Sequence, residues 1–257
     1  MSENDPQGLL NNSIAKAITL LNAFSYEKPR LRLKDISVIT GINQATAHRL
    51  LNTLKKFNLI EQHDGVYLLG RGFLKFESIV LSSMEIRRVC LPFLEELSNK
   101  LKVNVNLAVL DEGEVVYVAR AETSYCVYGF FHIGMRRPIN CTALGKVLTC
   151  KSPEKVHAIF ESGVKRYTLN TIVDEQKYLE EIEKVRLLGY GVDLEEWSNG
   201  INCIAAPLYD STGEIVAGIS ISGPQSAYSV ERILEYAPIL IEYSNDISAR
   251  LGSRRGC

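Results

Sequence analysis

Residues 40–70 read TGINQATAHRLLNTLKKFNLIEQHDGVYLLG, and this stretch predicts the fold of the first part of the chain. Gly41 is typical of the left-handed residue that ends a helix. Asn43 is well placed to cap the next helix, because its side-chain oxygen can accept a backbone N–H from the first turn. Apolar residues then recur at i, i+3, i+4 and i+7 and predict the buried stripe of that helix: Ala47, Leu50, Leu51 and Leu54.

The opposite face of this helix is polar and basic. At about 100° per residue it collects Ala45, His48, Arg49, Asn52 and Lys56, with Gln44 and Thr46 at its N-terminal end. A short helix, a turn with glycine and a polar second helix are typical of a helix-turn-helix, whose second helix places its N-terminal residues on base edges in the major groove. We therefore predict that these seven residues contact double-stranded operator DNA.

Residues 59–70 contain two short β-like runs joined at residues 63–65, which predicts a hairpin. Helical patterns over residues 13–24, with Ser13 as a cap, and over residues 33–39 precede it. Three helices and a hairpin make a winged helix. Two alternatives stay open: a simple helical hairpin, and a winged fold that serves as a protein-interaction module.

Charge is divided unevenly along the chain. The formal net charge of the whole is −1, which by itself argues against binding to phosphates. The first 75 residues hold ten Lys or Arg against six Asp or Glu, a net charge of +4, and the rest therefore carries −5. Such asymmetry indicates two modules with different partners, although a segment of +4 can also arise by chance on a solvated surface.

Composition excludes several classes of protein. Of 257 residues 46% are apolar and 23% are charged, with 18 Gly and 8 Pro, which excludes collagen-like, low-complexity and globally disordered chains. The N-terminus shows no secretory signal, and no apolar run reaches the length that spans a membrane. Six cysteines at irregular spacings are typical of reduced thiols. We expect a cytoplasmic protein with no membrane association.

The middle of the chain predicts a linker. The amphipathic pattern over residues 73–89 predicts a linker helix, and Pro92 predicts the start of a new helix, because proline disfavours helix in the residue before it and suits a first turn. The apolar face of this segment fits a dimer seam and a plain core equally well. The expected domains are a DNA-binding domain at residues 12–72, the linker helix, and an effector-binding domain at residues 90–252.

Beyond residue 102 the pattern mixes strands and helices. We expect a hairpin around residues 111–113, a further strand at residues 125–131, two strands joined at residues 211–213, and a last helix interrupted at Pro238. Helical patterns lie between these strands, without the regular alternation of a Rossmann fold. The pattern predicts an α+β domain with helices packed on an antiparallel sheet.

Two serines stand out in the last strand. Ser220 and Ser222 are two residues apart, so both project from one face, opposite Ile219 and Ile221. Buried hydroxyls need partners, which a bound carboxylate could supply; solvent or neighbouring strands are the alternative. Cys203 is more often a small apolar core residue than a reactive thiol.

Several motifs resemble one family in the same order along residues 12–251. The segment quoted first resembles the DNA-binding part of the IclR family of bacterial transcription regulators. RRPINCTALGKVL (residues 136–148), GYGVDLEEWSNGINCIAAPLYD (residues 189–210) and VAGISISGP (residues 216–224) resemble its effector-binding domain. RYTLNTI at residues 166–172 and the CTALGK form are most similar to the sugar-acid, keto-deoxygluconate type.

The resemblance implies a winged helix-turn-helix, a linker helix and a GAF-like α+β domain that binds a small carboxylate metabolite. It also implies a homodimer through the N-terminal part, or a dimer of dimers. The pocket positions that align are Cys126, Gly129, Ala143, Leu144, Asp193, Ile201, Cys203, Ser220 and Ser222. Ala143 and Leu144 start a helix whose free N–H groups suit an anion, and they stand where the family's loop can carry Gly.

An enzyme and a metal- or redox-responsive regulator are the alternatives to an allosteric regulator. An enzyme with a nucleophilic cysteine needs a base, and neither His132 nor His157 lies in a catalytic signature, so we expect no enzyme activity. A metal- or redox-responsive regulator could use Cys141, Asp193 and Cys203, because mixed sulfur and oxygen ligands can hold zinc. We assign no metal and no cofactor. A repressor and an activator both fit the sequence.

Overall fold

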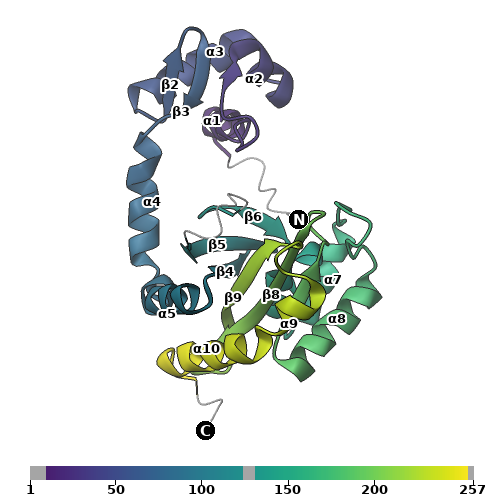
Figure 1. The fold of residues 1–257 in the computed structure, drawn as a ribbon. Coiled ribbons are helices and arrows are strands. Elements are labelled where there is room, and N and C mark those ends of the chain that lie inside the picture. Colours follow the sequence, from purple (N-terminus) through teal and green to yellow (C-terminus); the bar gives the residue numbers. More distant parts are fainter. Residues whose placement is uncertain (1–9, 124–130, 254–257) are drawn as a thin grey trace, which may run out of the picture. The chain divides into compact units, whose positions relative to one another are not determined.

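The computed structural model describes residues 10–123 and 131–253 and divides the chain into two compact units, Met1–Ser83 and Met84–Cys257 (Figure 1). Among the described residues, no helix is both long and apolar enough to cross a membrane.

The first unit is a winged helix-turn-helix, as the sequence predicts. Its elements are α1 (Asn12–Leu21), β1 (Leu31–Arg32), α2 (Leu33–Thr40), α3 (Gln44–Lys56), β2 (Ile60–His63), β3 (Val66–Leu69) and α4 (Gly72–Ser83). The strands form an antiparallel sheet in the order β1-β3-β2. Side chains from the first three helices and the sheet make one apolar core, in which Leu20, Ile36, Leu51 and Tyr67 are buried.

Local signals set the ends of these helices. Gly41 is left-handed and ends α2, and Oδ1 of Asn43 accepts the N–H of Thr46 at 2.9 Å and caps α3. The expected cap of α1 was wrong by two residues. Asn11, not Ser13, accepts the first N–H groups, because its carboxamide oxygen reaches those of Ser13 and Ile14.

The helix boundary expected at Pro92 was also wrong. The break lies at Met84, whose backbone is extended, and α5 (Glu85–Leu101) runs through Pro92. Pro92 and Arg88 are both exposed, so the carbonyl that loses its helical partner lies on the solvent side. The opposite face of α5 buries Cys90, Leu94 and Leu97 against the sheet, and burial of this face offsets one missing hydrogen bond.

A six-stranded antiparallel sheet forms the centre of the second unit. Its strands are β6 (Arg136–Pro138), β5 (Glu114–Ala121), β4 (Asn104–Asp111), β9 (Ile215–Pro224), β8 (Ile201–Tyr209) and β7 (Gly191–Leu194), in that spatial order. The hairpins expected around residues 111–113 and 211–213 are present as β4–β5 and β8–β9. The strand expected at residues 125–131 falls almost wholly outside the described residues.

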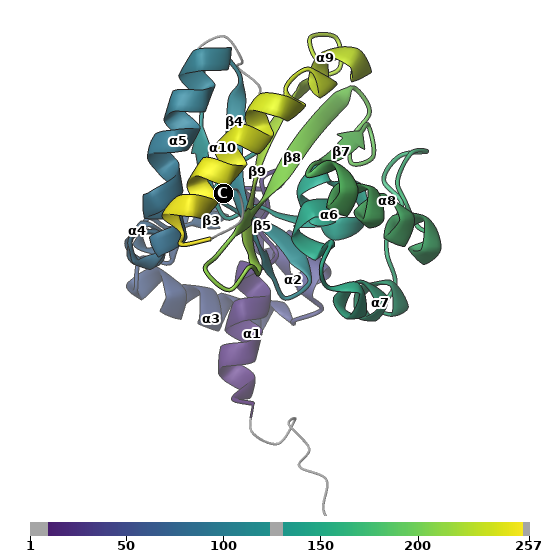
Figure 2. The same cartoon turned by 90° about the horizontal axis from the view of Figure 1, so that it is seen from below.

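Helices cover both faces of this sheet (Figure 2). On one face α5 and α10 (Ala237–Arg250) pack together, with α9 (Val230–Leu234) ahead of Pro238. On the other lie the short 3₁₀ helix η2 (Ile139–Cys141), α6 (Ala143–Thr149), α7 (Pro153–Glu161) and α8 (Glu175–Leu188). The alternation of β9 divides its side chains between the two faces, so Ile219 and Ile221 join the α5–α10 core.

Gly145 brings α6 unusually close to η2. A Cβ at this position would lie 2.2 Å from the backbone oxygen of Ile139. We expect Gly145→Ala to lower the free energy of unfolding by about 3 kcal/mol, because backbone must shift. The measurement is urea unfolding followed by fluorescence of Trp197, the single tryptophan, which lies in the second unit.

The matched control for this prediction is Gly134→Ala. An added Cβ at Gly134 meets no atom within 4 Å, but the residue has φ +81°, so the left-handed conformation alone costs about 1–2 kcal/mol. Equal losses in the two variants would contradict the close approach of α6 to η2.

Candidate functional site

The predicted DNA-contacting residues share one side of α3. Gln44, Ala45, His48, Arg49 and Lys56 are exposed, whereas Thr46 and Asn52 are half-buried. The amide nitrogen of Asn52 lies 3.3 Å from Nε2 of His48 one turn earlier, so these two side chains are held together. Ala47 and Leu51 are buried on the opposite side. The arrangement is that of a recognition helix, and contact of these residues with bases stays a prediction.

One residue near this face joins α3 to the wing. Nζ of Lys55 donates to Oε1 of Gln62 on β2 at 3.1 Å. Sequence reasoning did not single out Lys55, because the pairing depends on the fold of the hairpin and not on helical spacing. The hydrogen bond adds a polar contact between α3 and the wing to their shared apolar core.

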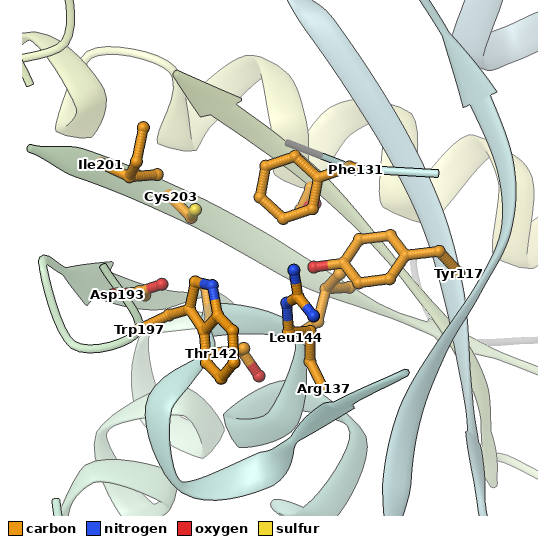
Figure 3. A pocket seen from close by; sticks show the side chains of 11 residues that line it. Tyr117, Phe131, Arg137, Thr142, Leu144, Asp193, Trp197, Ile201 and Cys203 are labelled. Carbon is orange, nitrogen blue, oxygen red and sulfur yellow. The ribbon is translucent and has the colours of Figure 1, made fainter. Parts of the chain in front are cut away.

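The second unit contains a pocket between its sheet and α6 (Figure 3). Six of its lining residues were predicted from the sequence: Ala143, Leu144, Asp193, Ile201, Cys203 and Ser220. Ser222 is buried on the same face of β9 but is not among the lining residues. Cys126 and Gly129 lie outside the described residues.

Five other lining residues were not predicted: Tyr117, Phe131, Arg137, Thr142 and Trp197. They come from β5, β6, the segments before β6 and α6, and the loop after β7. The tertiary fold brings them beside β8 and β9. A usable signal was present at Arg137 and Trp197, which both lie inside the motifs quoted for the family resemblance.

Arg137 and Trp197 form a stack in this pocket. The guanidinium carbon of Arg137 lies 4.1 Å from the centre of the Trp197 ring, and that ring lies 4.3 Å from the ring of Tyr167. Nη1 of Arg137 donates to the carbonyl of Arg136 at 3.2 Å. Attraction between a cation and an aromatic face holds the guanidinium in a defined orientation.

Asp193 is a buried carboxyl in the pocket wall. Its Oδ1 accepts the N–H of Glu196 at 2.7 Å. Burial, with a smaller contribution from the charge of Glu196, raises the pKa of Asp193 to about 7. The hydrogen bond from the backbone N–H of Glu196 and the positive charge of Lys146 act in the opposite direction. The carboxyl can therefore carry a proton at neutral pH.

A buried ion pair holds the loop that carries Asp193. Nζ of Lys146, on α6, lies 2.5 Å from Oε1 of Glu196 and 2.7 Å from the carbonyl of Val192. The Lys146 side chain is 1% exposed. Because Val192 and Glu196 flank Asp193 in the sequence, this lysine positions the segment that carries the carboxyl.

Asn106 organises the two serines from the neighbouring strand β4. Its Nδ2 lies 3.1 Å from Oγ of Ser222 and 3.4 Å from Oγ of Ser220. The alternative that the serines pair with a neighbouring strand is therefore realised. As the amide donates to both hydroxyl oxygens, each hydroxyl proton stays available for another acceptor.

The cavity between these side chains is small. Its volume of about 10 Å³ is the space of about one water molecule. A molecule with several heavy atoms does not fit this cavity unless lining side chains move apart.

The metal alternative gains no support. Among residues 10–123 and 131–253, His, Cys, Asp and Glu form no group of three that could hold an ion. Burial raises the pKa of the Cys141 and Cys203 thiols well above the ordinary value, whereas a metal ligand is the thiolate. Cys141 also does not line the pocket.

Comparison with known families decides the class of the protein. The IclR helix-turn-helix domain matches residues 13–64, and the C-terminal domain of bacterial IclR transcriptional regulators matches residues 78–249. The chain belongs to the IclR family of bacterial transcription regulators. The family resemblance and the fold class inferred from sequence are thus confirmed, and the relatives are regulators, not enzymes.

Similar regulators span nearly the whole chain. The HTH-type transcriptional regulator KdgR of Escherichia coli is 32% identical, with 94% of this chain and 93% of the relative covered. KipR of Bacillus subtilis is 29% identical over 96% of this chain and 98% of its own length. Membership in the IclR family therefore applies to both units.

Solved IclR-family structures share the fold. The crystal structure of Thermotoga maritima IclR has 28% identity and a TM-score of 0.73, covering 94% of this chain and 99% of that one. An IclR homologue from Microbacterium hydrocarbonoxydans complexed with 4-hydroxybenzoate has 22% identity and a TM-score of 0.77, covering 93% and 99%; at that identity it supports the fold alone.

Asp193 predicts how stability depends on pH. Its pKa of about 7 in the folded chain lies above its ordinary value of 3.8, so the folded state retains a proton that the unfolded state releases as pH rises. Stability falls as pH rises between these values. We expect Asp193→Asn to remove about 2 kcal/mol of the decrease in unfolding free energy between pH 5 and pH 7, measured by urea unfolding with Trp197 fluorescence.

Asp210→Asn is the control for this measurement. The hydroxyl of Thr212 and nearby backbone N–H groups lower the pKa of Asp210 below its ordinary value, so this carboxyl does not change protonation in that range. An identical pH dependence in Asp193→Asn and the unmodified chain would show that Asp193 is ionised throughout.

Proposed function

We propose that the chain is an allosteric DNA-binding regulator whose affinity for its operator changes when a small carboxylate metabolite, such as a keto or sugar acid, binds in its second unit. The observation that carries the proposal is the combination of two sites in one chain. One is a helix-turn-helix with an exposed polar and basic face on α3, and the other is a buried pocket with polar groups that converge on it.

Charge supports the DNA part of the proposal. The net charge of +4 lies in the first 75 residues, which contain the helix-turn-helix. Neutralisation of phosphates by lysine and arginine supplies the sequence-independent part of DNA affinity, while side chains on base edges supply specificity. Arg49, exposed on the first half of α3, is the proposed base-reading residue of the set.

Regulation requires that the metabolite bind the DNA-competent and the incompetent state unequally. Couplings between two sites are typically about 5- to 150-fold in affinity. Residues proposed to contact the effector are Asp193, Ile201, Cys203 and Ser220, with Ala143 and Leu144 at the start of α6. Cys126, Gly129 and Ser222 remain proposed from family resemblance.

Exposed apolar residues support a homodimer through the first unit. On α1, Ile14 and Ile18 are 62% and 51% exposed, and on α4 Phe76 and Ile79 are 54% and 55% exposed. Apolar side chains clustered on two helices are typical of a surface that another protein covers. We propose a homodimer, or a dimer of dimers, acting on operator DNA in the cytoplasm without a metal or cofactor.

Arg49→Ala tests the DNA part. We expect operator affinity to fall by about 1–3 kcal/mol, because a base contact is lost, measured by fluorescence anisotropy with DNA from upstream of the chain's own gene. Lys16→Ala, which removes one positive charge from the exposed side of α1, is the charge-matched control. Equal losses in the two variants would show that Arg49 contributes charge alone.

Ser220→Leu tests the effector part. A leucine fills the small cavity, so we expect operator binding to remain while the response to every acid is lost. The measurement is operator affinity with and without a panel of keto, sugar and aromatic acids, and Ser220→Ala, which removes only the hydroxyl, should keep a weakened response. Persistence of the full response in Ser220→Leu would place the effector elsewhere.

A further inference from the structure

Arg137 is the one basic residue among the described residues that line the pocket. It comes from β6 at the edge of the sheet, where it pairs with Val115. Its side chain extends into the group of labelled residues between Trp197 and Tyr117 (Figure 3). A guanidinium in this position can pair with an anionic group.

Two neighbouring cations, Lys146 and Arg136, form ion pairs and do not line the pocket. Lys146 pairs with Glu196 beneath the pocket wall. Arg136, the residue before Arg137, donates to Asp111 at 2.8 Å and to Glu114 at 2.6 Å on the surface. Successive residues of a strand point to opposite faces, so these two arginines face opposite directions, and Arg137 is the one of the two that lines the pocket.

The environment of Arg137 favours a fixed geometry. Its guanidinium lies on the Trp197 ring, and Tyr167 supports Trp197 from another loop. Tyr167 and Trp197 lie in two separate loops that the fold brings together. A planar guanidinium held in this way loses little conformational freedom when it forms two parallel hydrogen bonds to a carboxylate.

Other polar groups of the pocket suit a second oxygen on the ligand. Ser220 has a hydroxyl proton to donate, because Asn106 donates to its oxygen. Asp193 can donate or accept, since burial raises its pKa to about 7. These groups lie on β9 and β7 and Arg137 lies on β6, and all three line the same pocket, so different ends of one ligand can contact them.

We propose that Arg137 binds the carboxylate of the effector, that Trp197 positions its guanidinium for this contact, and that Ser220 and Asp193 bind a hydroxyl or keto oxygen of the same ligand. The inference rests on the proposed function and names the chemistry of its effector site. Because one face of Trp197 is occupied by the guanidinium, Trp197 acts as a positioning residue and does not stack on the ligand.

The test compares acids with their neutral amides. Pyruvate, gluconate and benzoate, each with the corresponding amide, are titrated into the full chain by isothermal calorimetry. We expect an oxygenated acid, pyruvate or gluconate, to bind more tightly than its amide and than benzoate. Arg137→Gln should lower the affinity for that acid about 10- to 100-fold, while the affinity for the amide changes less than about 3-fold. Arg136→Gln is the matched control and should bind as the unmodified chain does.

Two more variants separate charge from position. Arg137→Lys keeps the charge without the planar fork, so its affinity for the acid should lie between those of the unmodified chain and Arg137→Gln. Trp197→Phe should keep most of the preference for the acid, and Trp197→Ala should lose it. Near-ultraviolet circular dichroism checks that each variant is folded, and an unfolded Arg137→Gln leaves Arg137→Lys to carry the test.

Each contrary result has a definite meaning. If the unmodified chain prefers the acid and Arg137→Gln keeps that preference, Arg137 does not bind the carboxylate and the proposed function stands. Equal losses for acid and amide would make Arg137 a structural residue. If the unmodified chain binds none of the acids, or binds amides equally well, the carboxylate effector itself is wrong, and the assignment of Arg137 is wrong with it.

Discussion

The pairing of β4 with β9 is the interaction on which the second unit depends. It joins residues 104–108 to residues 218–222 at the centre of the sheet, and the remaining strands add outward from it. A slip of one residue would move Ile219 and Ile221 to the pocket side and the serines into the apolar core. Asn106, which lies opposite Ser220, forms its hydrogen bonds to the serines only in the observed register.

Buried charge is the second constraint on the site. An ion pair such as Lys146–Glu196 gains little net stability, because desolvation offsets most of the attraction between the charges. Its effect is on position: it fixes Val192 and Glu196, and therefore Asp193 between them. A carboxyl held this way keeps a raised pKa without the freedom to turn toward solvent.

Local patterns predicted the three helices and the hairpin of the first unit, because their turns and caps depend on residues close in sequence, such as Gly41 and Asn43. They did not predict β1, which forms only by pairing with β3. The same reasoning failed at Pro92, since burial of one face of α5 is a tertiary effect that outweighs the preference of proline. In the pocket, motif resemblance supplied Asp193 and Ser220. It did not supply Arg137, whose place beside Trp197 is set by the order of strands and by a loop 60 residues later in the sequence.

β4 and β9 are neighbours in the sheet but lie far apart in the sequence, and this sets an order of events during synthesis. Asn106 and Ser220 are 114 residues apart, and at about 5–20 residues per second a ribosome needs roughly 6–23 s to deliver the second after the first. The core of the first unit is complete by Tyr67. A nascent or prematurely ended chain therefore holds every residue of the DNA-binding core before the central strand of the sensor exists. Under the proposed function, such a fragment would occupy operator sites without responding to any metabolite, and the cell gains from removing it quickly.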